Sequence, residues 1–352
     1  MHGIQLVKYG SPKESLVYKE DLPIPKIKSP HEVLVRIKAA GVNPVDAKVA
    51  SGNIKFSTFI ISVPSILGAD FAGIIVEKGA AVTEFEVGDE VFGSLYFPSS
   101  LNGTYAQYTV VDITKASIAK KPQHLSFEQA ASAGIAVLTA YQGIVKNGHR
   151  VETHPHEKRK ILIAGASGGV GSYGVQLAKT IYAENTVVGI CSGKNIEFVK
   201  SLGADQVIDY KDEVAYKSFI TEEKDTFDII FDCVGGEDYY RQLDPLLKKN
   251  GVYSTAVGPI EHIGSNHIGL FNIVSIISKV GYKKIFAPHT YAVITTLPNA
   301  DFRNKIAPLF EAKAIHGTVH EDSNIIPLTE GYKAHERLLT HRTVGKIVLK
   351  ID

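Results

Sequence analysis

The stretch KILIAGASGGVGSYGVQLAK, residues 160–179, is the most informative part of this chain. An apolar run leads into a glycine-rich turn, and the turn leads into sequence with helical periodicity. On the pattern G-x-G-x-x-G, Ala166 stands at the first position, Gly168 at the third and Gly171 at the sixth. A strand, a glycine turn and a helix in this order are typical of a dinucleotide-binding unit, in which the helix N-terminus stabilises the pyrophosphate charge.

The glycines of this turn have separate expected tasks. Gly168 would let the backbone approach a pyrophosphate, and Gly171 would let the helix and the strand pack closely. The alternative is a glycine-rich turn without a ligand. The candidate cofactor-binding residues of the turn are Ser167, Gly168, Gly169, Val170 and Gly171.

The turn opens a series of alternating strands and helices. The predicted strands are residues 160–166, 186–192, 206–210, 227–234 and 251–257, and the predicted helices between them include 174–181, 194–202, 214–220 and 239–249. The strands are almost continuously apolar, as strands covered on both faces must be. The alternation therefore predicts an α/β fold with a doubly wound parallel sheet.

The end of the second strand indicates which dinucleotide binds. An acid about 20 residues after the turn would hold the ribose 2′-hydroxyl of NAD, but TVVGICSGKN, residues 186–195, contains no acid. Ser192 and Lys194 stand there instead, a hydroxyl and a cation suited to a 2′-phosphate, and Tyr210 could close the same pocket. The sequence therefore predicts NADPH; the alternative for Lys194 is a solvated residue at the start of a helix.

The first 120 residues have a different sequence pattern, in which short β-like runs alternate with proline and glycine. The predicted strands are 32–42, 73–82, 89–95 and 104–111. This spacing is typical of a small barrel or sandwich. A helix is then predicted over 126–145, with Ser126 and Gln129 as a capping box. Over the last fifty or so residues, the sequence predicts one or two helices and a final strand.

The composition excludes several classes of protein. The 352 residues suggest two domains, and a net charge of +1 gives no basic excess for nucleic acid. Cys191 and Cys233 are expected to be buried free thiols. The N-terminus has no apolar leader, and the apolar window 269–282 is too short to span a bilayer. We expect a cytoplasmic protein in which this window is a core or dimer-face helix, with an interfacial helix as the alternative.

Six segments in order along the chain carry a family resemblance: AAGVNPVD (39–46), GADFAG (68–73), VGDEVFG (87–93), GTYAQYTVV (103–111), AGASGGVG (164–171) and VGKIVL (344–349). The chain resembles the medium-chain dehydrogenase/reductase superfamily from end to end. It is most similar to the zinc-free quinone oxidoreductases, the zeta-crystallin branch, and in particular to the group of the reticulon-interacting mitochondrial and chloroplast-envelope quinone oxidoreductase homologues. The resemblance implies a GroES-like β-rich catalytic domain (1–127 and 296–352) and a Rossmann cofactor domain (128–295).

The resemblance also bears on metal. Zinc alcohol dehydrogenases of this superfamily have Cys where this chain has Asn43 and His where it has Ala69. Neither residue can replace a thiolate or an imidazole on Zn²⁺. His154 and His156 could chelate a metal, although an exposed loop is the simpler interpretation. We expect no metal.

Without a Lewis acid, a conjugated acceptor is easier to reduce than a simple alcohol is to oxidise. Hydride addition to an enone or quinone leaves an enolate-like oxygen that a hydrogen-bond donor can stabilise. Asn43 matches the family's active-site asparagine and is the expected donor; the alternative is a turn-forming Asn before Pro44. Asp46 is expected to order this loop. Lys48, where several quinone reductases have an aromatic residue, is the second catalytic candidate, with bulk water as the other proton source.

The expected function is therefore NADPH-dependent, zinc-independent hydride transfer to a quinone or an α,β-unsaturated carbonyl. The alternatives are an NADPH-binding interaction or trafficking protein with little catalysis, and a zinc alcohol dehydrogenase. The expected partners are a small-molecule acceptor and a second copy of the chain, without nucleic acid and without an integral membrane segment. The resemblance adds four cofactor-binding candidates: Thr139, Val234, Val257 and Lys346.

Overall fold

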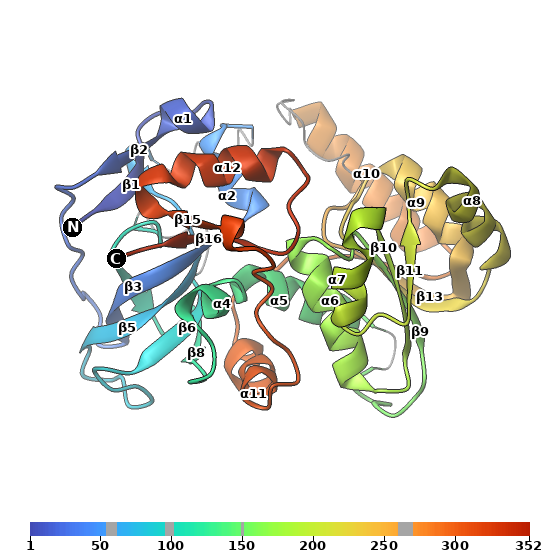
Figure 1. Cartoon of the computed structure of the whole chain (residues 1–352), viewed down its shortest axis with the longest axis horizontal. Helices are drawn as coiled ribbons and strands as arrows, with labels where there is room; N and C mark the ends of the chain where they lie inside the picture. Colours follow the sequence, from blue (N-terminus) through green and yellow to red (C-terminus); the bar gives the residue numbers. More distant parts are fainter. Residues whose placement is uncertain (54–61, 96–101, 149–150, 260–269) are drawn as a thin grey trace. The chain divides into compact units, whose positions relative to one another are not determined.

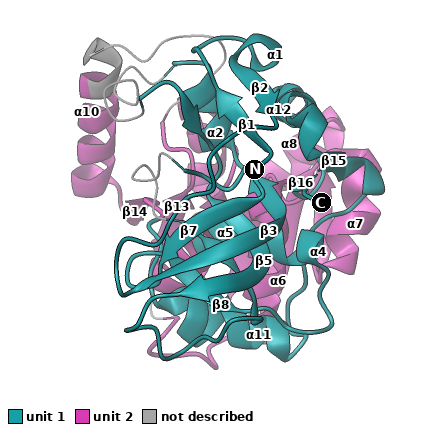
Figure 2. Ribbon diagram, turned by 90° about the vertical axis from the view of Figure 1, so that its left-hand side faces the viewer, with its two compact units in different colours: residues 1–138, 297–352 teal, residues 139–296 magenta. Residues whose placement is uncertain are grey.

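The computed structural model describes residues 1–53, 62–95, 102–148, 151–259 and 270–352, with side chains from 274 onward in the last range. The chain divides into two compact units (Figure 1). Unit 1 contains residues 1–138 and 297–352, and unit 2 contains residues 139–296. Both chain ends therefore belong to unit 1, as the colouring of Figure 2 shows.

Unit 2 is built on a six-stranded parallel sheet in the order β11-β10-β9-β12-β13-β14. This is the doubly wound arrangement that the sequence predicts. The strands are β9 (Lys160–Ala164), β10 (Thr186–Cys191), β11 (Gln206–Asp209), β12 (Phe227–Asp232), β13 (Leu247–Thr255) and β14 (Thr290–Val293). The helices of this unit are α6 (Gly169–Ile181), α7 (Ile196–Ser201), α8 (Glu213–Glu222), α9 (Glu237–Leu243) and α10 (Leu270–Phe286).

Two features of this unit differ from the sequence prediction. The helix predicted over 239–249 is wrong beyond Leu243, because Pro245 has no N–H to continue the helical hydrogen bonds. The chain forms a single 3₁₀ turn there, and Leu247 already begins β13. The sixth strand, β14, is missing from the prediction because its four residues carry no clear periodicity.

Unit 1 contains a seven-stranded sheet and a three-stranded sheet. In the larger sheet the path is β15-β16-β3-β5-β6-β8, with β7 paired to β3, and the smaller sheet has the order β2-β1-β4. The strands are β1 (Gly3–Leu6), β2 (Leu16–Lys19), β3 (Glu32–Val42), β4 (Ser65–Ile66), β5 (Asp70–Lys78), β6 (Glu90–Ser94), β7 (Tyr108–Asp112), β8 (Ser117–Lys120), β15 (Ile325–Pro327) and β16 (Ile347–Lys350).

Two strand predictions in unit 1 have wrong ends. The strand predicted over 73–82 stops at Lys78, because a hydrogen bond from the Val82 amide to the Gly79 carbonyl closes a turn. The strand predicted over 104–111 begins only at Tyr108. The helices of unit 1 include α1 (Pro12–Ser15), α2 (Pro44–Ala50), α4 (Phe127–Ala131), α11 (Ala307–Glu311) and α12 (Gly331–Leu339).

The helix predicted over 126–145 is interrupted. Its capping box is confirmed, because Ser126 and Gln129 exchange backbone-to-side-chain hydrogen bonds at 3.0 and 3.1 Å. The first segment, α4, ends before Gly134, whose φ of +23° is unfavourable for other residues. The chain continues as α5 (Gly134–Tyr141) and a π-helical segment, η1 (Gln142–Lys146).

The apolar window 269–282 forms most of α10, although its first residue, Gly269, lies outside the described residues. The core interpretation is wrong for one face of this helix, since five of its large apolar side chains are more than half exposed. They are Val274, Ile277, Tyr282, Ile285 and Phe286. The part of the chain that the structure describes contains no helix long and apolar enough to cross a membrane.

A histidine is buried in the core of unit 1. His335 of α12 is 0 % exposed and packs edge-on against the ring of Tyr105, with the ring centroids 5.7 Å apart. Neither of its ring nitrogens meets a hydrogen-bond partner among the described residues. Burial disfavours the charged imidazolium and lowers the pKa of His335 from 6.5 to about 4.

This burial makes unit 1 sensitive to acid. The unfolded chain takes up a proton on His335 near pH 6.5 but the folded chain does not, so the contribution of this group to stability is lost as the pH falls from 6.5 toward 4. We expect His335→Leu to remove this dependence. Between pH 8 and pH 5 the free energy of unfolding of the variant should rise relative to the parent by about 2 kcal/mol.

Urea unfolding of both proteins at several pH values measures this difference. The difference between the two proteins isolates His335 from other titrating groups that both proteins share. Parallel pH dependence of the two unfolding free energies would contradict the prediction.

Candidate functional site

In unit 2, the glycine turn joins the end of β9 to the start of α6. A Cβ atom on Gly171 would lie 2.2 Å from the Gly165 carbonyl oxygen, so only glycine fits at this contact between turn and helix. A Cβ atom on Gly168 would have one neighbour within 4 Å, the same oxygen at 3.4 Å, which is an ordinary contact. The protein itself therefore requires glycine at 171, and it leaves space beside Gly168.

The turns that follow β9 and β10 are hydrogen-bonded to each other. The side-chain amide of Asn195 donates to Ser167 Oγ at 3.0 Å and to Ser192 Oγ at 3.1 Å. The structure thus brings together two predicted site residues that are 25 positions apart in the sequence. Sequence reasoning missed Asn195, although it directly follows Lys194 in the same short turn.

The other residues predicted to recognise a 2′-phosphate lie at the same edge of the sheet. Lys194 is exposed, and Tyr210 follows β11 with 51 % of its surface exposed. The Tyr210 amide donates to the Cys191 carbonyl at 3.1 Å, which holds it beside the end of β10. An acid that the sequence reasoning missed also lies here: a Cβ atom on Gly193 would be 2.2 Å from Asp209 Oδ2.

A buried carboxylate orders the next two turns of this edge. Asp232, 1 % exposed, accepts hydrogen bonds from the Val234 and Gly235 amides through Oδ1, both at 2.9 Å. Its Oδ2 accepts from Tyr253 at 3.1 Å and from Thr255 at 3.2 Å. Burial raises the pKa of Asp232, and these four donors oppose the increase. Sequence reasoning missed this residue as well.

Asp232 thereby positions two predicted cofactor residues. Val257 packs over Gly235, where a Cβ atom would approach the Val257 side chain to 2.5 Å, and Val234 faces Gly165 of the first turn. Thr139, at the start of unit 2, lies with its hydroxyl 2.7 Å from the Thr296 hydroxyl. The carboxyl ends of β9, β10, β12 and β13 therefore carry most of the predicted cofactor residues on contiguous turns.

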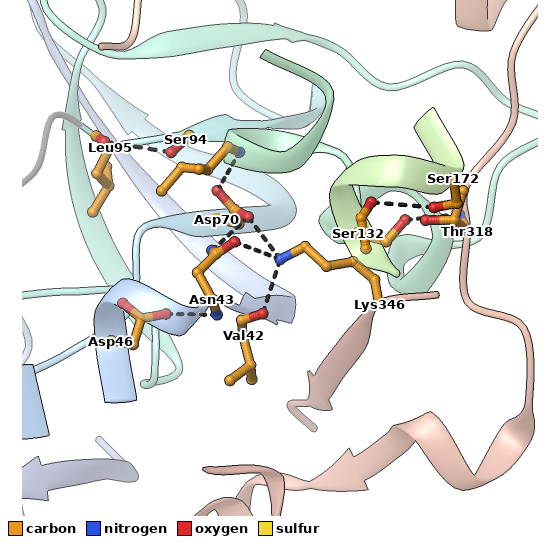
Figure 3. Close-up of polar contacts among 12 residues, drawn as sticks. Val42, Asn43, Asp46, Asp70, Ser94, Leu95, Ser132, Ser172, Thr318 and Lys346 are labelled. Carbon is orange, nitrogen blue, oxygen red and sulfur yellow. Dashed lines mark hydrogen bonds and ion pairs between the residues drawn. The ribbon is translucent and has the colours of Figure 1, made fainter. Parts of the chain in front are cut away.

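In unit 1, Asn43 directly follows β3 and is the N-cap residue of α2, and it is almost fully buried at 3 % exposure. Its Nδ2 donates to Asp70 Oδ2 at 2.8 Å, and its Oδ1 accepts from Lys346 Nζ at 2.7 Å (Figure 3). The second N–H of Nδ2 has no acceptor within the described ranges. The side chain is thus held on both sides, and it also occupies the N-cap position of α2 before Pro44.

Asp46 orders this loop through its carboxylate. Its Oδ2 accepts from the Asn43 amide at 2.9 Å and from the Tyr105 hydroxyl at 2.8 Å. Its Oδ1 is buried without a partner in the described part of the chain. Burial raises the pKa of Asp46 to about 6, although both hydrogen bonds oppose the increase. Lys48, two residues further on in α2, is partly buried, and burial lowers its pKa.

The residues around Asn43 do not fit a metal ion. Asn43 Oδ1 already contacts the ammonium group of Lys346, which would repel a second cation. Ala69, where zinc enzymes of the resembled superfamily have a histidine, is buried and has no ligand atom. No cluster of three or more His, Cys, Asp or Glu side chains suited to a metal occurs within the described residues. His154 and His156 lie on an exposed loop, next to residues 149–150 that are outside the described residues.

The cysteines are free, as expected, but only Cys191 is fully buried. Cys233 is partly exposed, which corrects the expectation of two buried thiols.

Comparison with known proteins places the chain in a family. Residues 29–123 match the alcohol dehydrogenase GroES-like domain, and residues 202–349 match the zinc-binding dehydrogenase family. The chloroplast envelope quinone oxidoreductase homolog of Arabidopsis thaliana is 32% identical over 99% of this chain and 98% of that protein. The NADPH-dependent alkenal/one oxidoreductase of the same species is 30% identical over 95% of this chain and 75% of that protein.

Solved structures agree with these relatives. The quinone oxidoreductase from Coxiella burnetii is 29% identical with a TM-score of 0.79, covering 100% of this chain and 99% of that one. The Escherichia coli quinone oxidoreductase, solved with NADPH, is 25% identical with a TM-score of 0.74 and covers 100% of both chains. The predicted fold, a GroES-like domain plus a Rossmann-like parallel sheet, is confirmed. This chain belongs to the medium-chain dehydrogenase/reductase superfamily, among relatives that include quinone and alkenal oxidoreductases.

Proposed function

We propose that this chain is an NADPH-dependent reductase of quinones or α,β-unsaturated carbonyls that works without zinc. One observation carries the proposal. A buried amide, Asn43, is held between Asp70 and Lys346 with one N–H unused, at the position where zinc enzymes of the superfamily place a metal ligand. The dinucleotide turn and the names of the relatives support the same reaction class.

Binding of NADPH is assigned to unit 2. The proposed pyrophosphate site is the turn Gly168–Gly171, where space remains beside Gly168 and the N-terminus of the 13-residue helix α6 presents its free amides. Ser192 and Lys194 are proposed to contact the 2′-phosphate, with Asn195 fixing the hydroxyl of Ser192. The carboxylate of Asp209 beside this turn favours Lys194 by charge but opposes the phosphate, so Lys194 has to offset it.

When bound, NADPH supplies the hydride. The acceptor then develops negative charge on its oxygen, and the proposed role of Asn43 is to donate its free N–H to that oxygen. Protonation completes the reduction. Lys48 is the proposed proton donor because burial lowers its pKa and so makes the ammonium a readier acid; bulk water is the alternative.

A second candidate function is a protein that binds NADPH but works mainly through interaction. The exposed apolar face of α10, with five large side chains more than half exposed, favours this alternative. A panel of quinones, enones and enals with purified protein separates the two functions. NADPH oxidation that depends on an acceptor supports the reductase, whereas NADPH binding without turnover on any acceptor supports the interaction protein.

The turn gives a first prediction from a matched pair of glycines. Gly168→Val should weaken NADPH binding at least tenfold with little change in melting temperature, because its side chain enters the proposed phosphate space rather than the protein. Gly171→Ala should instead lower the melting temperature, because its Cβ would meet a backbone oxygen at 2.2 Å. Fluorescence titration and thermal unfolding measure both effects. Unchanged NADPH affinity in Gly168→Val would show that the turn holds no phosphate.

Cofactor choice gives a second prediction. Lys194→Ala should weaken NADPH binding roughly 10- to 100-fold and leave NADH binding nearly unchanged, since a charge-assisted phosphate contact is lost. Lys200→Ala, which removes another exposed lysine from the neighbouring helix α7, is the control and should change neither affinity. Equal losses for both cofactors in Lys194→Ala would refute the assignment.

Catalysis gives a third prediction. Asn43→Ala should lower kcat by about 10²–10³, the typical effect of removing one oxyanion donor, while the dissociation constant of NADPH stays within about twofold. Chelators should leave the parent enzyme fully active. If Asn43→Ala kept the parent's kcat under conditions where the chemical step limits the rate, the role of Asn43 would be structural only. Loss of activity on chelation would refute the metal-free mechanism.

A further inference from the structure

Lys346 is a buried cation with a complete set of partners. Its side chain is 5 % exposed, and its ammonium group donates to the Val42 carbonyl at 2.9 Å, to Asn43 Oδ1 at 2.7 Å and to Asp70 Oδ2 at 3.2 Å. A lysine ammonium has three N–H donors, and these three contacts use them all. No donor of Lys346 is left to bind a cofactor, the role that the resemblance implies for it.

Asp70 is held as firmly as Lys346. Its Oδ1 accepts from the Ile135 amide at 2.8 Å, and its Oδ2 accepts from Asn43 and Lys346. The carboxylate also packs directly on Gly134, where a Cβ atom would lie 2.0 Å from Oδ1. Asp70 is 0 % exposed, so neither water nor a side-chain rotation can easily replace these contacts.

These contacts select one orientation of the Asn43 amide. In the observed orientation the amide oxygen faces the ammonium and the amide nitrogen faces the carboxylate. A flipped amide would place its N–H groups against the ammonium and its oxygen against the carboxylate, and both contacts would be repulsive. Because the site is buried, these differences are larger than they would be in water.

We propose that Lys346 and Asp70 are positioning residues for Asn43, and that Lys346 is not a cofactor ligand. The pair fixes the direction of the free N–H of Asn43, and the ammonium polarises the amide so that this N–H becomes a stronger donor. The inference rests on the proposed role of Asn43 as oxyanion donor.

The test compares Lys346→Met with Lys350→Met, a control that removes the exposed lysine of β16, the strand that directly follows Lys346. Lys346→Met should lower kcat on a quinone or enone about 10- to 100-fold and leave the NADPH dissociation constant within about twofold. Lys350→Met should change neither quantity. An increase of tenfold or more in the NADPH dissociation constant of Lys346→Met, with kcat unchanged, would overturn the proposal and restore the cofactor-binding role.

A double-mutant cycle tests whether Lys346 acts through Asn43. The double variant Asn43→Ala, Lys346→Met should be no slower than Asn43→Ala alone, because the residue that Lys346 positions is already absent. If the two substitutions instead lowered kcat independently, so that their fold-losses multiplied in the double variant, the proposal would be overturned. If Lys346→Met does not fold because Asp70 is left unpaired, the variant Asp70→Asn, Lys346→Met removes both charges and should show the same loss of kcat at unchanged NADPH affinity.

Failure of this positioning proposal can be distinguished from failure of the proposed function. If the parent protein reduces no acceptor, the proposed function fails, and the same cycle is then followed by urea unfolding. The predicted contacts require a coupling between Asn43 and Lys346 in the free energy of unfolding. Additive changes in that free energy would overturn the positioning role without any measurement of activity.

Discussion

The buried ion pair between Lys346 and Asp70 is the interaction on which unit 1 depends. It joins β16, near the end of the chain, to β5 and to the end of β3. The same strands pair directly, with Ile347 opposite Val42 in the ladder. A buried pair of charges is costly unless each charge is fully hydrogen-bonded, and here each has all its partners. The polar groups that hold the N-terminal and C-terminal segments of unit 1 together are therefore also those of the proposed active site.

Burial also explains the titration behaviour of other groups in unit 1. Desolvation raises the pKa of Asp46 and lowers those of Lys48 and His335, because in each case the charged form loses water. Asp46 and His335 oppose each other in the pH dependence of stability. On acidification, the first favours the folded chain and the second disfavours it. Lys48, whose pKa is lowered by burial, is the proposed proton donor.

In unit 2, the proposed cofactor site depends on the topology of the parallel sheet. In a parallel sheet all strands end at the same edge, so the turns after β9, β10, β12 and β13 meet whatever their separation in sequence. Side chains then connect these turns: Asn195 joins the first two, and Asp232 joins the last two through the backbone and Thr255. Ligand residues and the residues that order them are thus recruited from most of the unit.

The sequence by itself determined the parallel sheet, the glycine turn, the capping box at Ser126 and the family, because each depends on local periodicity or on short motifs. It failed at the helix stopped by Pro245, whose missing N–H the helical periodicity does not record, and at the short strand β14, whose four residues carry no clear periodicity.

Only the tertiary structure decided which partners surround each candidate residue. Asn195 and Asp70 contact partners far away in the sequence, and Asp232 adds Tyr253 and Thr255 to the two neighbouring amides that it binds. Lys346 lies 303 positions from Asn43, and no sequence pattern states that its three donors are already used. Periodicity records which face of an element is buried, whereas hydrogen-bond partners depend on the packing of the whole unit.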